Sequence, residues 1–559
     1  MALQTPVAAQ LAREADRVQQ RALQQEEERR RIKEEQLRKE LKRPPAGLEP
    51  QKLKPSIPIQ KDSTCVEVNF INVDGVTILS VKTIDKLTAP YVSKCLGLKD
   101  INELLRAITN KYIAKGYVTT RVYLPEQDVS TGVLQLKVIE GGVEDIQLND
   151  GKRDQWQLKA PFLGIKGQLL NLRDLEQGLD QFNRLASNNA TIQLVPGGKT
   201  GQSIVALKNE PAKEWRASVG WDNSGQESTG KSKYSLGFEK DNFLGYSDLL
   251  ALSYAATPLP WRSEEPPKQS RSFFGYWSIP LGYWTVSLSG SRFTYASPIQ
   301  GVAEVFSNEG NTAWQSFVLD RVVHRNAKGK TALGLSLEHR KVDSFIEDVL
   351  LETGSYETTD LGFTFSHSRR LWGGALSLLL GYHHGADFLW ASDPLEGEYT
   401  PNLDYNRLEW SLGYHRPVSI DGQNLLWSTN LYAQYGLEIL PPSERISIGS
   451  RYTVRGFSND SLSGDSGGYV RNELSWRLPF PKFGQRAITA CEFFAAYDAG
   501  LIVQDESDPF ERGHLQGASV GFRSIGRVKA GLTLAKGVAA PGFLNRENYE
   551  LYSSVIVTF

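Results

Sequence analysis

The strongest constraint on the fold of this chain is a long series of strand-like segments that begins near residue 214 and runs to the C-terminus. Within each segment apolar and polar residues alternate, which is the period of a β-strand with two different faces. Helical periodicity is lost throughout this region. Sixteen segments are predicted to be strands, approximately 214–223, 230–240, 247–256, 271–280, 283–293, 311–323, 329–341, 357–368, 373–384, 406–416, 424–435, 469–478, 488–499, 514–523, 527–535 and 550–559.

The intervals between these segments alternate in length. Most even-numbered intervals are tight turns, such as residues 241–245, whereas most odd-numbered intervals are longer, and 436–468 is the longest. Short turns on one rim and long loops on the other are typical of outer-membrane barrels. A soluble sandwich also alternates but rarely has sixteen strands with this asymmetry. Residues 214–559 therefore predict a transmembrane β-barrel of sixteen antiparallel strands.

The overall composition excludes only a helical membrane protein. The chain has 63 Lys and Arg against 64 Asp and Glu, so its charge gives no argument for binding nucleic acid. The mean hydropathy is -0.36, and no stretch approaches the ~20 apolar residues of a membrane-spanning helix. Hydropathy does not detect barrels, because their lipid-facing and lumen-facing residues alternate and the average is polar.

The N-terminal region is polar and divides into two parts. Residues 5–43 have a helical pattern in which glutamates precede basic residues by four positions, but its apolar stripe is thin. Such a helix does not bury in an apolar core, so these residues alone indicate a solvated or disordered arm. Residues 44–62 contain five prolines and are expected to form an extended linker. Met1–Gln4 do not resemble a signal peptide, and we expect the numbering to describe a processed chain with an added Met.

Two small mixed domains are predicted between the linker and the barrel, over residues 63–141 and 142–213. In each, apolar residues at helical spacing are followed by two strands, 118–124 and 133–139 in the first domain and 190–195 and 202–208 in the second. The helix stripes are expected to form the cores. An exposed edge strand of such a domain can pair with an extended partner chain.

Two motifs and the chain terminus then carry a family resemblance. Val454-Arg455-Gly456-Phe457 lies in the longest interval, Asp498 follows on a strand, and the chain ends on Phe559. These features resemble the VRGF/Y tetrad, the inward Asp and the terminal aromatic of the BamA superfamily. The two-partner secretion (TpsB) branch, the FhaC, ShlB and CdiB group, is the most similar. Residues 116–119 and 124–128 resemble the first POTRA domain of that family.

The resemblance implies that the loop 436–468 folds back into the barrel lumen, where Arg455 pairs with Asp498. An arginine fork can donate two parallel hydrogen bonds to one carboxylate, and Gly456 lets the backbone approach the wall. Arg471 and Glu473 are expected to add lumen contacts. The alternative is that Arg455 is a solvated loop residue. One position departs from the family, which usually has Phe two residues before the Asp, where this chain has Ala496.

The resemblance further implies a periplasmic POTRA1 (63–141) and POTRA2 (142–213), and a plug helix (5–43) inside the barrel of a Gram-negative outer membrane. The expected function is secretion of an unfolded, β-rich exoprotein without nucleotide hydrolysis or cofactor. The expected partners are a TpsA-type adhesin, haemolysin or contact-dependent toxin, outer-membrane lipid, and the barrel-assembly machinery through Phe559. The alternatives are an insertase of the same superfamily and a passive pore or adhesin.

In a periplasmic domain Cys65 and Cys95 are expected to form a disulfide, with two buried free thiols as the alternative, while Cys491 lies far away.

Residues 464–468 reproduce the Gly-Asp-Ser-Gly-Gly pentad of chymotrypsin-like proteases, but none of the seven histidines has a protease-like context, so we interpret it as a chance match. His383 and His384 are adjacent on a predicted strand and point to opposite faces, so they cannot chelate one metal. We predict no catalytic and no metal site.

Overall fold

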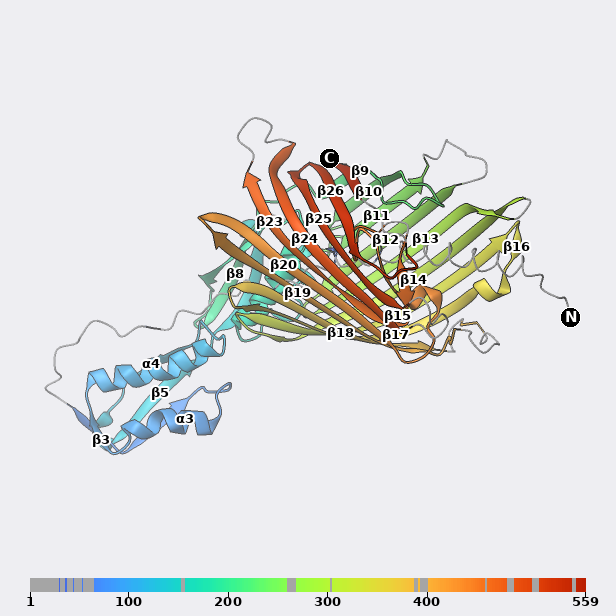
Figure 1. The fold of residues 1–559 in the computed structure, drawn as a ribbon. Helices are drawn as coiled ribbons and strands as arrows, with labels where there is room; N and C mark the ends of the chain where they lie inside the picture. The colour runs from blue at the N-terminus through green and yellow to red at the C-terminus, as the bar shows by residue number, and fades with distance from the viewer. Residues whose placement is uncertain are drawn as a thin grey trace.

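The computed structural model describes residues 30, 36–37, 44, 53, 65–151, 156–258, 268–301, 304–386, 391–392, 401–457, 460–479, 487–504, 512–544 and 549–559. Two small α+β domains lie at one end of a closed β-barrel (Figure 1). Most of the expected helix 5–43 and linker 44–62 lies outside the described residues.

The first small domain contains two helices and five strands. Its elements are β1 (Val66–Val68), β2 (Phe70–Asp74), α3 (Val81–Thr88), β3 (Lys94–Leu96), α4 (Leu98–Ala114), β4 (Arg121–Tyr123) and β5 (Val133–Ile139). The three-stranded sheet has the order β2-β5-β4, and β1 pairs separately with β3. The α4 side chains at helical spacing, Leu104, Ile108 and Tyr112, are fully buried and pack with β5 residues such as Leu134. The apolar stripe thus forms the core, as its spacing predicts.

One expected strand of this domain is shorter than predicted. Residues 118–124 were expected to be extended throughout, but only Arg121–Tyr123 pair in the sheet. The Arg121 guanidinium donates to the carbonyl oxygens of Val118 at 2.9 Å and Thr120 at 2.8 Å. These carbonyl groups are therefore satisfied by a side chain and not by a sheet partner.

The second small domain repeats the same arrangement with fewer strands. Its elements are β6 (Gly142–Leu148), α5 (Trp156–Lys159), α6 (Leu172–Asn183), β7 (Thr191–Pro196) and β8 (Gln202–Lys208). The sheet order is β6-β8-β7, so β6 and β7 are edge strands. Leu175 and Phe182 of α6 are buried with β8 residue Val205.

The remaining strands form a closed antiparallel barrel, and the prediction of sixteen strands is confirmed. They are β9 (Trp215–Asp222), β10 (Lys233–Asp241), β11 (Leu249–Thr257), β12 (Gln269–Leu281), β13 (Trp284–Gln300), β14 (Val305–Arg325), β15 (Gly329–Ile346), β17 (Tyr356–Leu371), β18 (Gly374–Ala386), β19 (Asn406–Ile420), β20 (Gln423–Gly436), β23 (Ser466–Pro479), β24 (Ile488–Gln504), β25 (Gly513–Gly526), β26 (Val528–Ala539) and β27 (Glu550–Thr558). The two-residue strand β16 (Val349–Leu350) only extends the β15 hairpin. The ring closes where β27 pairs with β9.

Several strands are longer than predicted at the rim that carries the long loops. The expected segment 311–323, for example, is extended over Val305–Arg325 as β14. A membrane band of about 25 Å accounts for the apolar alternation, whereas the strand ends beyond it carry polar residues on both faces. The pattern of outward apolar residues therefore predicts only the membrane-spanning part of each strand and not its full length.

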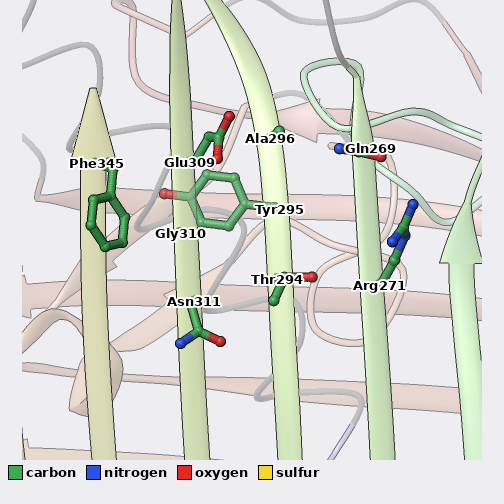
Figure 2. A pocket seen from close by; sticks show the side chains of 9 residues that line it. All are labelled: Gln269, Arg271, Thr294, Tyr295, Ala296, Glu309, Gly310, Asn311 and Phe345. Atoms are coloured by element: carbon green, nitrogen blue, oxygen red, sulfur yellow. The ribbon is translucent and has the colours of Figure 1, made fainter. Parts of the chain in front are cut away.

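Alternate residues of each strand face outward and inward, as the period of two requires. On β12 to β15 the outward row Trp277, Leu288, Phe317 and Leu337 is apolar across four paired strands. Toward the long-loop rim the outward residues become polar, and a hollow of about 250 Å³ there is lined by Arg271, Thr294, Glu309 and Asn311 among others (Figure 2). The side chains of these four residues face away from the lumen. No helix in the described ranges is long and apolar enough to cross a membrane.

The second small domain is fixed to the short-turn rim of the barrel through α6 and the residue that follows it. The Arg184 guanidinium is buried and donates to Ser278 Oγ at 2.7 Å and to the carbonyl oxygen of Ser247 at 2.9 Å. Arg325 at the end of β14 lies 2.7 Å from Asp180 of α6. These buried, charge-assisted contacts hold the domain at the entrance of the barrel.

Candidate functional site

The loop between β20 and β23 is packed inside the barrel. We call residues 437–465 the lumen loop. The loop predicted from the sequence, 436–468, also included residue 436 of β20 and residues 466–468 of β23. The loop forms a small hairpin of β21 (Ile446–Ile448) and β22 (Leu462–Gly464). Its residues Ile448, Val454 and Phe457 are buried against wall residues of β24 and β25 such as Ile502 and Leu515. Apolar packing thus stabilises the loop within the lumen.

Arg455 at the tip of the lumen loop meets Asp498 of β24 in a two-pronged contact. Arg455 Nε lies 2.6 Å from Asp498 Oδ2, and Nη2 lies 2.8 Å from Oδ1. The backbone N–H of Arg455 also donates to Oδ2 at 3.3 Å. The Arg455 and Asp498 side chains are 5% and 1% exposed. This bidentate pair is the geometry expected for a guanidinium on a carboxylate that little solvent screens.

Two further charged residues of β23 complete the network. Glu473 Oε2 accepts from Arg455 Nη1 at 3.3 Å, and Glu473 Oε1 lies 2.5 Å from Nη2 of Arg523 on β25. Arg471 is the register partner of Asp498, with its Nε 3.8 Å from Asp498 Oδ1, and donates to the carbonyl oxygen of Tyr452 at 2.7 Å. Asp498 therefore faces two arginines, and Glu473 links the tip to β25.

Three wall glycines, which the sequence analysis missed, form the surface on which the tip rests. A Cβ at Gly517 of β25 would overlap the carbonyl oxygen of Arg455. A Cβ at Gly500 would lie 2.9 Å from Val454, and one at Gly537 would lie 2.8 Å from the ring of Phe457. We call Gly500, Gly517 and Gly537 the glycine seats. Their signal in the sequence is a glycine at an inward position of each of three successive strands.

The backbone of the tip fits the same wall. Gly456 has φ +98°, a conformation that L side chains rarely adopt, and its N–H donates to the Tyr552 hydroxyl of β27 at 3.2 Å. Ala496 leaves the family's usual Phe position without a ring, but Phe494 of the same inward face lies 5.7 Å from the Arg455 guanidinium. An aromatic contact to the guanidinium is thus present from a neighbouring position.

The protease-like pentad belongs to the base of the lumen loop. Ser466 Oγ accepts from the Gly436 N–H at 3.1 Å, and Asp465 Oδ1 accepts from the Leu440 N–H at 2.9 Å. Both residues are buried, and these hydrogen bonds join the two ends of the loop.

His383 and His384 point to opposite faces of β18, as the alternation predicts. His383 Nδ1 lies 2.8 Å from Asp360 in the lumen, whereas His384 is 38% exposed near Asp404. In the described parts of the chain, no group of three or more His, Cys, Asp and Glu side chains is arranged to hold a metal ion.

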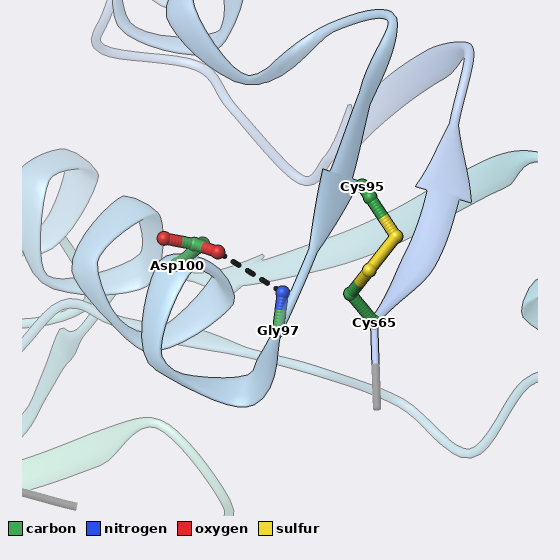
Figure 3. The surroundings of a disulfide bond; sticks show 4 residues. All are labelled: Cys65, Cys95, Gly97 and Asp100. Atoms are coloured by element: carbon green, nitrogen blue, oxygen red, sulfur yellow. Dashed lines mark hydrogen bonds between the residues drawn. A yellow bond between two sulfur atoms is a disulfide. The ribbon is translucent and has the colours of Figure 1, made fainter. Parts of the chain in front are cut away.

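The structure contains a disulfide between Cys65 and Cys95 in the first small domain (Figure 3). It joins the start of β1 to β3, close to the helix start at which the Gly97 N–H donates to Asp100 at 3.0 Å. Cys491 of β24 is a free cysteine.

Glu140 joins separate segments of the same domain through hydrogen bonds. Its carboxylate accepts from the N–H groups of Thr77 at 2.8 Å and Ile78 at 3.1 Å and from the Tyr112 hydroxyl at 2.7 Å. Burial acts to raise the pKa of Glu140, but the hydrogen bonds from Thr77, Ile78 and Tyr112 outweigh it and hold the pKa below its usual range. The ionised carboxylate therefore stabilises this domain at neutral pH.

Three described residues of the expected helix 5–43 are Arg30, Gln36 and Leu37. The Arg30 guanidinium lies 3.5 Å from the ring centroid of Trp314, an inward-facing residue of β14, and Leu37 packs on the cluster that contains Trp314. These contacts lie on the lumen side of the wall.

Comparison with known proteins agrees with this architecture. The family of haemolysin secretion/activation proteins ShlB/FhaC/HecB matches residues 201–524, and the ShlB-type POTRA family and a second POTRA family match residues 66–141 and 142–196. The outer membrane transporter CdiB of Escherichia coli is 33% identical over 502 residues, which cover 89% of this chain and 83% of that protein. The hemolysin transporter protein ShlB of Serratia marcescens is 31% identical over 490 residues, with coverages of 86% and 81%. The solved structure of CdiB from Escherichia coli has a TM-score of 0.87 at 31% identity and covers 100% of both chains.

A sixteen-stranded barrel with two POTRA domains at its short-turn rim and a loop folded into its lumen defines an outer-membrane transporter, with the POTRA domains in the periplasm. The protein is therefore a transporter and not an enzyme. The chain belongs to the ShlB/FhaC/HecB family of two-partner secretion transporters.

Proposed function

We propose that this transporter secretes one cognate exoprotein, of the TpsA type, from the periplasm to the cell surface. The observation that carries the proposal is the lumen loop, which occupies the inside of the barrel and is attached to the wall by a buried ion pair between Arg455 and Asp498. A loop held in this way closes the lumen at rest and can be released. The relatives that support a cargo class include a hemolysin transporter protein, ShlB, beside the outer membrane transporter CdiB. The proposed classes of cargo are a haemolysin, a contact-dependent toxin and an adhesin.

The entry site is proposed to be an exposed strand edge of POTRA1. Strand β2 lies at the edge of its sheet, and its residue Phe70 is 70% exposed. In POTRA2 the edge strand β7 likewise leaves Leu194 and Val195 exposed. An unfolded, β-rich chain can add a strand to such an edge, with backbone hydrogen bonds that supply affinity and apolar side chains that supply contact area. POTRA2 is fixed to the barrel, so a chain captured there is presented at the entrance.

Residues 5–43 are proposed to act as a plug helix. The contact of Arg30 with Trp314 supports a position in the lumen, and a polar helix suits a water-filled passage. Phe559, which is 61% exposed at the end of β27, is proposed as the signal for the barrel-assembly machinery. Outer-membrane lipid covers the apolar outward rows. No step in this scheme requires a nucleotide or a cofactor.

The proposal is tested by co-expression with the adjacent reading frame in a Gram-negative host. We expect the product of that frame in the culture medium or on the cell surface only when the transporter is present. Periplasmic retention of the product in both strains would contradict secretion. Assembly of other barrels that depends on this protein would indicate the insertase of the same superfamily. Open-pore conductance that does not respond to cargo would indicate a passive pore.

A further inference from the structure

The lumen loop is held at two places and not only at its tip. Glu444 lies before the hairpin, in a short 3-10 turn of residues Pro442–Glu444, and its side chain is 9% exposed. Its Oε1 lies 3.3 Å from Nη2 of Arg340 on β15, and its Oε2 lies 3.2 Å from Nη2 of Arg407 on β19. One carboxylate thus bridges two guanidinium groups from two strands.

The backbone around Glu444 is tied to the same part of the wall. Gln434 Nε2 of β20 donates to the carbonyl oxygen of Glu444 at 2.8 Å, and Gln434 Oε1 accepts from Arg407 at 3.2 Å. The Ser443 N–H donates to the Tyr356 hydroxyl of β17 at 3.3 Å. The attachment therefore extends over β15, β17, β19 and β20, and all of these groups are buried or partly buried.

The two attachments lie on different strands of the ring. Asp498, the partner of Arg455, is on β24, which lies three strands along the ring from β19 and six from β15. Between the two attachments, Ile446 and Ile448 of β21 are buried with wall residues of β20, β23 and β24. The segment from Glu444 to Arg455 is therefore held at both of its ends, whereas a segment held at one end would be free to move.

We propose that Glu444, through Arg340 and Arg407, is a second positioning residue of the lumen loop and fixes the end of the segment 444–455 that lies away from Arg455. Removal of a buried carboxylate that contacts two buried guanidinium groups costs free energy, because both positive charges lose that carboxylate while they remain buried and close together. Opening of the passage then requires that one of two separate ion-pair sites be broken. This inference rests on the proposed gating role of the loop, but the attachment itself is measured without cargo.

The test uses the full-length protein with Cys491→Ser, in which one introduced free cysteine reports on each end of this segment: Ser447→Cys near Glu444, or Thr453→Cys at the tip. Glu444→Gln keeps the size of the side chain and removes its charge. We expect Glu444→Gln to raise the maleimide-labelling rate of Ser447→Cys by about tenfold or more, the change that follows from losing a buried ion pair. The rate at Thr453→Cys should change by no more than about twofold, because the tip keeps its own partners.

Glu438→Gln is the matched control. Glu438 lies in the same loop and accepts from the N–H of Asn406 at 2.6 Å, but it contacts neither arginine. Its substitution should leave both labelling rates within about twofold. Heat-modifiable mobility verifies that each variant is folded. Should Glu444→Gln not assemble, Arg340→Gln removes one of the two arginine contacts and should raise the rate at Ser447→Cys by about threefold.

Unchanged labelling of Ser447→Cys in a folded Glu444→Gln or Arg340→Gln variant would overturn the second anchor. So would a larger response at Thr453→Cys than at Ser447→Cys. Failure of the proposed secretion function would leave these labelling rates untouched, since no cargo is present. The two proposals therefore fail separately.

Discussion

Asp498 should matter more to the loop than its partner Arg455, because the two substitutions leave different charges behind. Asp498→Ala leaves Arg455 with Glu473 at 3.3 Å and leaves Arg471 without the carboxylate 3.8 Å away. A broken buried pair costs about 3 to 5 kcal/mol, and with Glu473 still present we take about 3 kcal/mol, or roughly a hundredfold in released loop. Arg455→Ala leaves Asp498 with Arg471, so we expect about 2 kcal/mol, or roughly thirtyfold.

The assay is the labelling rate of Thr453→Cys in outer-membrane vesicles, in the Cys491→Ser background, with secretion of cargo measured in parallel. Both substitutions should lower secretion while the barrel still inserts. The double variant should label no faster than Asp498→Ala alone, since both changes remove one interaction. Glu309→Ala, a carboxylate on the outward face of β14, serves as the control. Additive effects in the double variant, or a larger effect of Arg455→Ala, would refute the pairing as argued.

Three further predictions follow from other parts of the molecule. Deletion of residues 5–43 should raise single-channel conductance in planar bilayers, because a helix about 10 Å across leaves the lumen; equal conductance would exclude the plug. Gly517→Val should displace the tip and lower secretion by about tenfold or more, because its side chain occupies the place of a loop carbonyl; Gly275→Ala, at which the nearest atom lies 3.5 Å away, is the control. POTRA1 should lose protection from limited proteolysis as the pH falls below roughly 4, because the depressed pKa of Glu140 contributes stability above the unfolded pKa that is lost as the carboxylate is protonated. In Glu140→Gln the protection should be lower at pH 7 and should change little with pH. If this variant lost its protection over the same pH range as the unsubstituted protein, the assignment to Glu140 would be contradicted.

The barrel could be predicted from the sequence because its evidence is local. Alternation with period two needs only neighbouring residues, and the short turns and long loops are visible as intervals between segments. The strand ends beyond the membrane were missed for the same reason: β14 residues such as Asn308 and Glu309 are polar on both faces, so the alternation that predicts a strand ends before the strand does.

The contacts of the lumen loop could not be derived in this way, because they depend on which strand reaches the loop. Arg455 and Asp498 were paired by resemblance alone, since nothing local links a loop residue to a strand more than forty positions away. No sequence pattern distinguishes Glu444 from the other glutamates of the chain. The arginines that it contacts, Arg340 and Arg407, lie on two other strands. The register between strands, which brings Gly517 beneath the tip, is a property of the closed ring.

The glycine seats also determine what a passing chain would meet after the loop has left. Over Gly500, Gly517 and Gly537 the inner wall presents backbone and no side chain, and the N–H and C=O groups there are already paired within the sheet. Asp498 is the register partner of Gly517, so its carboxylate stands beside these glycines once Arg455 has left. A passing polypeptide would therefore meet bare backbone at three positions and, next to it, the carboxylate that the loop has released.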